Sequence, residues 1–81
     1  MTAAGIRPVS FEERPATYRI VNDAAGMGRA LLTHCEFDHP TCRVAAEAVL
    51  ALQKGEMDPE VARKAFVAAL TAAGVFVRGE S

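Results

Sequence analysis

Hydrophobic and polar residues alternate along the first part of the chain, which is the spacing of β-strands. Val9 and Phe11 alternate with polar neighbours in residues 7–11. Residues 17–22 alternate in the same way, with Tyr18 and Ile20 on one face and Arg19 and Val21 on the other. A turn at residues 12–15 separates the two segments. This pattern predicts an N-terminal β-hairpin.

Helical spacing replaces the alternation in the next segment. A first helix is predicted to begin at a cap formed by Asn22 or Asp23 and to end near Cys35. One of its faces collects four apolar side chains: Met27, Leu31, Leu32 and Cys35. Gly26 and Gly28 each weaken a helix by about 1 kcal/mol relative to alanine. We therefore expect another backbone to approach this helix closely.

A second helix is predicted from Pro40 to Lys54, with Gly55 ending it. Its polar side chains form one narrow strip made of Arg43, Glu47 and Lys54. Apolar residues cover nearly all of the remaining surface: Val44, Ala45, Ala48, Val49, Leu50, Ala51 and Leu52. A helix that is apolar almost all round is normally covered on several sides. We expect this helix to be the central one.

The third helix has the clearest boundaries in the sequence. Asp58 is predicted to cap it, and Pro59 and Glu60 suit its first turn. Gly74 is predicted to close it in a left-handed conformation. The apolar residues 75–77 then leave as a short strand.

Different sides of this third helix predict different surroundings. One edge is expected to pack closely against a neighbour: Val61, Ala65, Ala68 and Ala72. Phe66, beside Leu70 and away from Arg63 and Lys64, is expected to anchor the core between the central helix and the sheet. Val67 falls on the polar side, where burial within one chain is not expected. It is therefore a candidate for self-association, together with Met57 and residues 76–78.

Length and composition describe one small folded domain. The 81 residues are 51% hydrophobic and 23% charged, with a formal charge of −1. This balance offers no attraction for nucleic acid or anionic lipid, and no apolar run reaches the length of a membrane span. We predict an α+β domain at residues 7–78, with a hairpin, three packed helices and a last strand joining the hairpin. Residues 1–6 and 79–81 are expected to be flexible ends. The two cysteines and the absence of an export signal favour reduced thiols in the cytoplasm.

Several short motifs resemble one known family. They are Arg-Pro-Val at residues 7–9, Ala25 with the pair Leu31-Leu32, Ala48 and Ala51 with Gly55, and the run at residues 62–69 followed by Ala-Gly-Val at 73–75. On these residues the chain resembles the small alphaproteobacterial proteins grouped as domain of unknown function 982, from about Arg7 to Val77. That family usually carries Trp-Pro after the double leucine, where this chain has Cys35-Glu36. The resemblance implies an α+β fold and no particular activity.

The residues that offer the most chemistry are His34, Cys35, His39 and Cys42, which lie within nine positions. Imidazole and thiolate are the usual zinc ligands. Adjacent ligands at 34 and 35 nevertheless point about 100° apart on a helix, and no Cys-x-x-Cys pair is present. A Cys-His catalytic pair needs a sheltering cleft, for which the chain has little volume. A disulfide between the two cysteines is conceivable but disfavoured by the expected compartment. Cys35 is expected to be buried and unreactive, with Cys42 more accessible.

Two other motifs have simpler interpretations. Gly26-Met27-Gly28-Arg29 lacks the third small residue of a dinucleotide-binding fingerprint and the parallel βαβ unit around it. Arg7, Arg14 and Arg19 are interleaved with Glu12 and Glu13, which favours a solvated strand face over a nucleic-acid surface.

We therefore predict a non-enzymatic interaction or regulatory module that uses no cofactor and has no catalytic residues. The expected partner is a second copy of the chain in a homodimer, and an unidentified protein partner is the other possibility. The alternative function is a metal-binding or thiol-dependent site around Cys35, His39 and Cys42.

Overall fold

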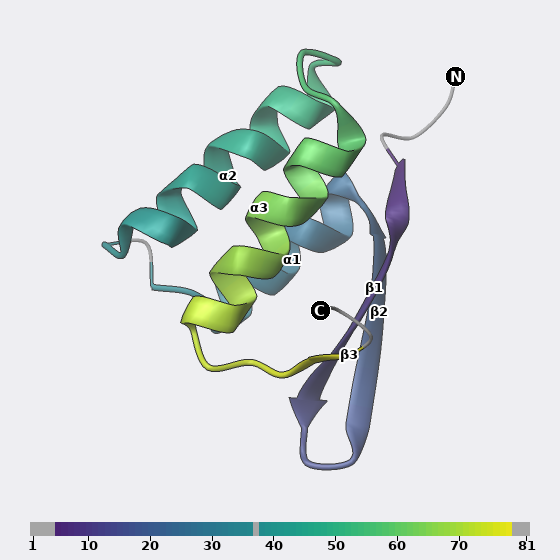
Figure 1. The fold of residues 1–81 in the computed structure, drawn as a ribbon, viewed down its shortest axis with the longest axis vertical. Coiled ribbons are helices and arrows are strands. Elements are labelled where there is room, and N and C mark those ends of the chain that lie inside the picture. The colour runs from purple at the N-terminus through teal and green to yellow at the C-terminus, as the bar shows by residue number, and fades with distance from the viewer. Residues whose placement is uncertain (1–4, 37, 79–81) are drawn as a thin grey trace.

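The computed structural model describes residues 5–36 and 38–78, which form three strands and three helices in one α+β domain. The strands are β1 (Gly5–Arg14), β2 (Thr17–Asp23) and β3 (Val77–Arg78). The helices are α1 (Ala24–His34), α2 (Pro40–Gln53) and α3 (Pro59–Ala72). The helices lie on one side of the sheet, with α3 between α2 and the strands (Figure 1). The predicted flexible ends fall mainly on residues 1–4 and 79–81, which lie outside the described residues, whereas Gly5 and Ile6 begin β1.

The N-terminal hairpin is confirmed, and it is longer than predicted. Antiparallel pairing of β1 with β2 continues to Arg14 opposite Thr17, so the predicted turn at residues 12–15 moves to Pro15 and Ala16. Ala16 turns the chain with a φ of 63°, and its N–H donates to a carboxylate oxygen of Glu12. Glu12 and Glu13 therefore continue the strand, because a two-residue turn is enough to reverse it.

The last strand joins the sheet, as predicted, at a slightly later position. The strand order is β2-β1-β3, and β3 pairs antiparallel to β1, with Val77 opposite Phe11. The N–H of Glu12 also donates to the Phe76 carbonyl at 2.9 Å. The predicted strand at 75–77 is observed at Val77–Arg78 because the helix ends in a left-handed Gly74, with φ 84°, and the chain needs two further residues to reach β1.

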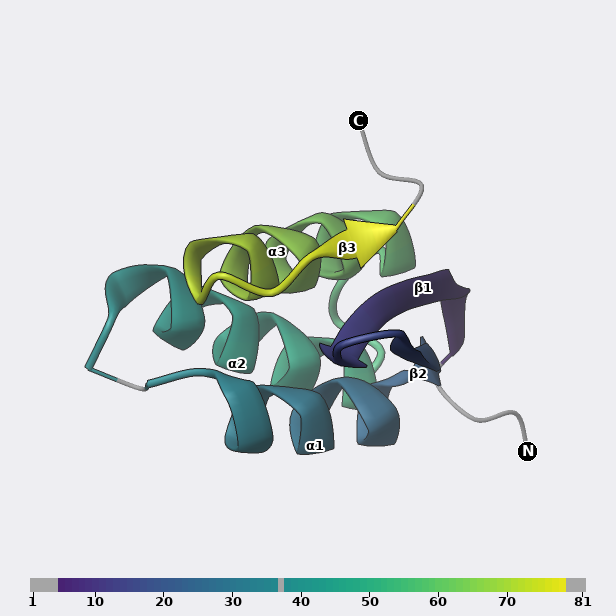
Figure 2. The ribbon, with the colours of Figure 1, turned by 90° about the horizontal axis from the view of Figure 1, so that it is seen from below.

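The central helix is α3, and the expectation that the second helix would be central is wrong. α3 packs against β1, β3, α1 and α2, whereas the main contacts of α2 are with α1 and α3 (Figure 2). Part of the apolar surface of α2 is therefore exposed to solvent, including Val44 and Leu50. The helical wheel of α2 predicted burial on several sides of the helix. Its main packing partners are two helices, which leave part of its apolar surface uncovered.

The buried face of α3 is centred on Phe66, which is fully buried as predicted. Its ring meets that of Phe11 on β1 edge to face, with centroids 6.5 Å apart. The edge that we expected to pack closely is wrong in part, because Val61, Ala68 and Ala72 are exposed and Ala65 is half-buried. The alanines that allow close packing are Ala62 and Ala69. Val67, predicted to be exposed, is half-buried against the core, and so is Met57.

Arg63 is buried on the same face as Phe66, contrary to the predicted polar side. Its guanidinium donates to the carbonyls of Arg7 and Pro8, at 3.1 Å each. The pairing of β1 with β2 shifts register between Gly5 and Val9, so this part of β1 departs from a regular ladder. Arg63 supplies donors to carbonyls there, which is how a buried charge is accommodated.

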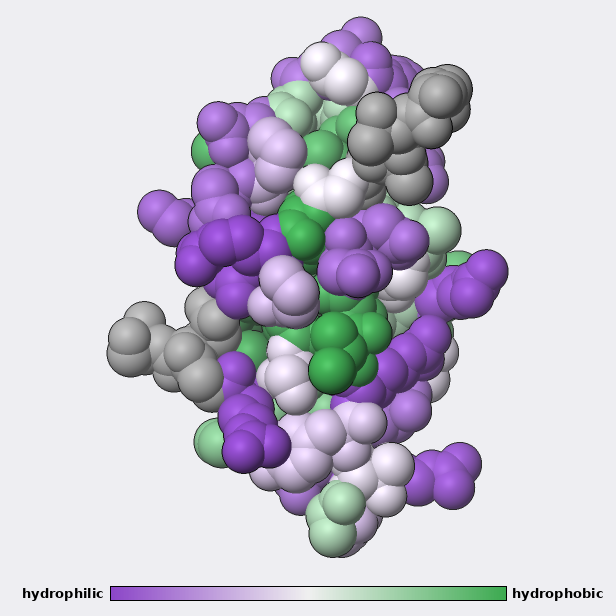
Figure 3. All heavy atoms as spheres, turned by 90° about the vertical axis from the view of Figure 1, so that its right-hand side faces the viewer, coloured by the Kyte–Doolittle hydropathy of each residue, from purple (hydrophilic) through white to green (hydrophobic). Residues whose placement is uncertain are grey.

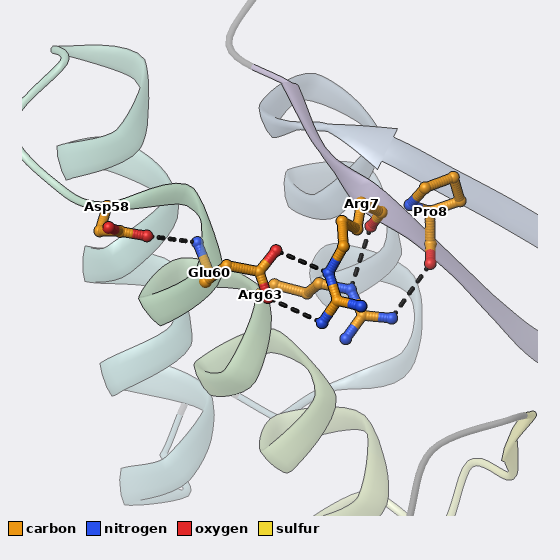
Figure 4. A network of polar contacts seen from close by, with 5 residues as sticks. All are labelled: Arg7, Pro8, Asp58, Glu60 and Arg63. Atoms are coloured by element: carbon orange, nitrogen blue, oxygen red, sulfur yellow. Dashed lines mark hydrogen bonds and ion pairs between the residues drawn. The ribbon is translucent and has the colours of Figure 1, made fainter.

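The same corner carries an ion pair that fixes the start of α3. Arg7 donates two hydrogen bonds to the two carboxylate oxygens of Glu60, both at 2.8 Å. Asp58 caps the helix by accepting from the Glu60 N–H at 2.8 Å (Figure 4). Strand β1 and helix α3 are thus joined by the side chains of Arg7, Glu60 and Arg63.

Candidate functional site

One exposed apolar surface is built by α1 and α2, which pack against each other. Asp23 begins α1 by accepting a hydrogen bond from the Gly26 N–H at 2.7 Å. His39 begins α2 by accepting from the Thr41 N–H through Nδ1 at 3.3 Å, and Pro40 occupies the first turn. These local caps fix where each helix starts and therefore which residues face each other across the pair.

A groove of about 290 Å³ lies between these two helices. We call it the α1–α2 groove, and its lining residues are Gly28, Leu31, Leu32, Ala46, Val49, Leu50 and Gln53. Leu31 and Val49 are buried, whereas Leu32 is 74% exposed and Leu50 is 57% exposed. Large apolar side chains thus project beside the groove, one from each helix. The expectation that Leu32 would share the buried stripe of the first helix is wrong, since it faces the groove and solvent.

The two glycines of α1 differ in what surrounds them. A Cβ on Gly26 would lie 3.1 Å from Asp23 Oδ1 and 3.2 Å from Val21 Cγ1, so this position is crowded. A Cβ on Gly28 would meet only Val49 Cγ1, at 4.0 Å. The predicted close approach is therefore found at Gly26 alone, and side chains cause it. Gly28 instead keeps the α1–α2 groove open.

The four chemistry-bearing residues of the sequence lie near a second, polar pocket where α1 ends and α2 begins. This pocket has a volume of about 260 Å³, and its lining residues are His34, Glu36, His39, Cys42, Ala72 and Ala73. His34 packs edge to face on Phe11, with centroids 5.5 Å apart, and its Nε2 lies 3.4 Å from a carboxylate oxygen of Glu13. These contacts direct the imidazole toward the sheet.

Both cysteines are buried free thiols in the described part of the chain. The prediction that Cys35 is buried is confirmed, and the prediction that Cys42 is more accessible is wrong: Cys35 is 8% exposed and Cys42 is 2% exposed. Cys42 lies on the buried stripe of α2 that continues through Ala45 and Val49. Burial, together with the hydrogen-bonded side chain of Cys42, raises the pKa of Cys35 to about 12.

The metal alternative has no support in this arrangement. Among residues 5–36 and 38–78, no group of three or more His, Cys, Asp or Glu side chains could hold a metal ion. The Cys35 thiol points toward the Ala69 carbonyl, 3.7 Å away, whereas the neighbouring His34 points toward Glu13. Adjacent residues on a helix point in different directions, which is why the adjacent positions of His34 and Cys35 were unfavourable for binding one metal ion.

The two remaining sequence motifs have structural roles. The N–H of Gly26 is bonded to the Asp23 carboxylate, and β1 and β2 are antiparallel, so the described residues contain no dinucleotide-binding unit at this glycine pair. Arg7 pairs with Glu60, and Arg19 pairs with Glu13 at 3.2 Å. Carboxylates therefore neutralise two of the three arginines of the hairpin region.

The outer face of the sheet is a second exposed apolar surface. Tyr18 and Ile20 of β2 are exposed on it, and the guanidinium of Arg78 lies 5.3 Å from the centroid of the Tyr18 ring. Figure 3 shows an apolar strip, in green, bordered by hydrophilic side chains on this side of the molecule. Polar side chains therefore border the exposed apolar residues of this face.

The fold and its sites define a small two-layer α+β protein with an exposed apolar helix pair. None of the helices in the described ranges is long and apolar enough to cross a membrane. The chain belongs to the family described as "Protein of unknown function (DUF982)", whose sequence profile matches residues 7–77. Comparisons with curated proteins and with solved structures found no significant match.

Sequence reasoning missed the α1–α2 groove, although a signal for it was present. The apolar surface of α2 extends almost all round the helix, and the groove uses Leu50 from the part that no described element covers. The sequence showed a surplus of apolar surface, and the tertiary structure shows where it is exposed.

Proposed function

We propose that the protein is a non-enzymatic interaction module whose α1–α2 groove binds a second copy of the same chain. The observation that carries the proposal is the pair of exposed leucines, Leu32 and Leu50, beside an apolar groove. Large aliphatic side chains exposed side by side on a small domain are typical of an interaction surface. A reducing compartment such as the cytoplasm suits a protein with two free buried thiols.

The shape of this surface favours a second copy as the partner. Small residues, Gly28 and Ala46, leave the hollow open, while Leu32 and Leu50 project beside it. A two-fold axis places the same patch on both sides of an interface, so projections of one copy can fill the hollow of the other. A surface that carries both the projections and the hollow is self-complementary.

The charges next to the groove are compatible with the same pairing. Arg29 lies one helical turn before Leu32 on α1, and Glu47 lies one turn before Leu50 on α2; both are exposed. Because the two side chains carry opposite charges, a two-fold arrangement can place Arg29 of one copy opposite Glu47 of the other. Electrostatic complementarity of this kind fixes orientation more than it adds affinity.

A standard interface would cover only a modest part of the surface of this chain. Such an interface takes about 800 Å² from each partner, which is about a sixth of the 5130 Å² accessible surface of this chain. The surface around the α1–α2 groove is formed by two of the three helices. Association also helps a chain of this length, because small domains bury a limited fraction of their surface when they fold alone.

Sedimentation velocity across the micromolar range tests the proposal. The wild-type protein should sediment with twice the 8.6 kDa mass of the chain. Leu32→Glu and Leu50→Glu should each give the single-chain mass, because a carboxylate would be buried in the interface without a partner. Both positions are exposed in the single chain, so the fold should be retained and circular dichroism should be unchanged.

Ile20→Glu is the matched control, since Ile20 is 68% exposed on the outer face of the sheet. This variant should remain dimeric. A wild-type protein that stays at 8.6 kDa throughout the concentration range would contradict self-association and leave the groove to a different protein. Dissociation by Ile20→Glu but not by the leucine variants would place the interface on the sheet and overturn the assignment to the α1–α2 groove.

A further inference from the structure

Gly28 lies in the middle of α1, where the surrounding described residues do not require a glycine. Its backbone is helical, since the glycines with a positive φ in the described ranges are Gly55 and Gly74. A Cβ at Gly28 would meet only Val49 Cγ1, at 4.0 Å, which is an ordinary van der Waals contact. Alanine would therefore fit here, and it suits a helix interior better than glycine does. The packing of a single chain thus gives no reason for the missing side chain.

The α1–α2 groove supplies the context that the single chain lacks. Gly28 is part of its wall, and so is Leu32, four positions later on the same helix. Residues with this spacing lie one above the other on the same side of a helix. Leu32 is exposed, so α1 presents a projecting leucine next to a position without a side chain. Two helices pack together when a side chain of one enters such a hole on the other.

We propose that Leu32 of each copy packs directly on the backbone of α1 at Gly28 of the other copy. The two α1 helices then cross antiparallel around a two-fold axis at the level of Ala30, midway between the two positions. This contact rests on the proposed function, self-association through the α1–α2 groove, and it determines which helix the groove accepts.

The spacing of these two residues makes a second copy the matching partner. When an antiparallel crossing places Gly28 of one copy opposite Leu32 of the other, the two-fold axis places the remaining Leu32 opposite the remaining Gly28. One arrangement therefore makes two identical contacts. The distance between two packed helices depends on the side chains at their crossing, so a glycine there lets the leucine reach the backbone.

Gly28→Ala separates the interface from the fold, because it should change them in opposite directions. In sedimentation velocity its dissociation constant should rise about tenfold, since the new methyl group occupies space taken by Leu32 of the other copy. Urea denaturation in a Leu50→Glu background, which is expected to remain a single chain, measures the fold alone. There Gly28→Ala should raise the urea midpoint, because alanine is the better helix former. An unchanged dissociation constant, or a lowered midpoint in the single chain, would overturn the proposal.

Gly26→Ala is the matched control, the same substitution two positions earlier on α1. A Cβ at Gly26 would face the side chains of Val21 and Asp23, and Gly26 is not among the residues that line the groove. Its dissociation constant should stay close to that of the wild type. A loss as large as that in Gly28→Ala would show that the effect belongs to α1 as a whole, and the assignment to Gly28 would fail.

Nuclear Overhauser effects in the wild-type dimer test the contact without any substitution. The dimer is assembled from isotope-labelled and unlabelled chains, and an isotope filter retains only the effects between copies. The Leu32 methyl protons should contact the Gly28 Hα protons of the other copy. Leu32 contacts that involve only α2 of the other copy would overturn this contact and leave self-association through the groove in place. A wild-type chain that sediments at 8.6 kDa throughout would overturn both proposals.

Discussion

Replacing Phe66 with alanine is expected to remove a large part of the stability of this domain. Phe66 is fully buried, and its ring packs edge to face on Phe11 of β1, the strand at the centre of the sheet. A buried aromatic ring covers about 150–250 Å², which at about 25 cal/mol per Å² corresponds to about 4–6 kcal/mol. Partial collapse of the cavity reduces this figure, and measured losses for Phe→Ala are about 3–5 kcal/mol.

This loss is large compared with the total. At about 0.05–0.15 kcal/mol per residue, a chain of 81 residues has a free energy of unfolding of about 4–12 kcal/mol. Phe66→Ala should therefore be partly or wholly unfolded at room temperature. Phe66→Leu keeps most of the volume and should lose about 1–2 kcal/mol.

Urea denaturation followed by far-ultraviolet circular dichroism measures both variants. Val61→Ala is the matched control on the same helix, because Val61 is exposed and its truncation should change the free energy of unfolding by less than about 0.5 kcal/mol. A Phe66→Ala variant with a urea midpoint close to that of the wild type would refute the reasoning. It would mean that the contact with Phe11 is peripheral to the core.

The polar corner between β1 and α3 yields two further predictions. Arg63→Met should lower the free energy of unfolding by about 2–3 kcal/mol in urea denaturation, because the carbonyls of Arg7 and Pro8 lose their charged donor. Lys64 is exposed, so Lys64→Met is the control. A loss in Arg63→Met no greater than that in Lys64→Met would contradict the prediction. The hydrogen bonds from Arg7 hold the pKa of Glu60 below its ordinary value of 4.5. The resulting stabilisation is present above pH 4.5 and is lost as the pH falls through the lowered pKa. In urea titrations at stepped pH, the difference in free energy of unfolding between wild type and Glu60→Gln should therefore shrink below pH 4.5. A difference that is constant from pH 7 to pH 3 would show that the ion pair contributes nothing to stability.

The sequence by itself determined the boundaries of the helices and the existence of the hairpin. Asp58 caps α3, and Asp23 caps α1, through hydrogen bonds to N–H groups two and three residues away. Gly74 has the left-handed conformation that was predicted for it. These features depend on neighbours within one turn, so the sequence contains all the information that they need. The burial of Phe66 was predictable for a related reason, since a large aromatic residue within an amphipathic helix has few other places to lie.

The candidate sites depended on how the elements pack, and only partial signals for them were present in the sequence. The chain showed that α2 has more apolar surface than an ordinary surface helix, but not which part would be left beside α1. Helical spacing predicted that Cys35 is buried beside Leu31. The same spacing places Cys42 on one face of α2 with Ala45 and Val49, but the sequence did not show that this face is the buried one.

Only the tertiary structure decided that α3 lies at the centre, that Arg63 is buried and that Leu32 and Leu50 remain exposed. The physical reason is that a helical wheel ranks the faces of one helix by polarity, whereas burial depends on how many neighbours each face receives. Arg63 shows this most clearly: its guanidinium can be buried because β1 presents two carbonyls to it, from residues more than fifty positions away in the chain. Contacts across such separations are fixed by the assembled fold, and no local pattern around Arg63 encodes them.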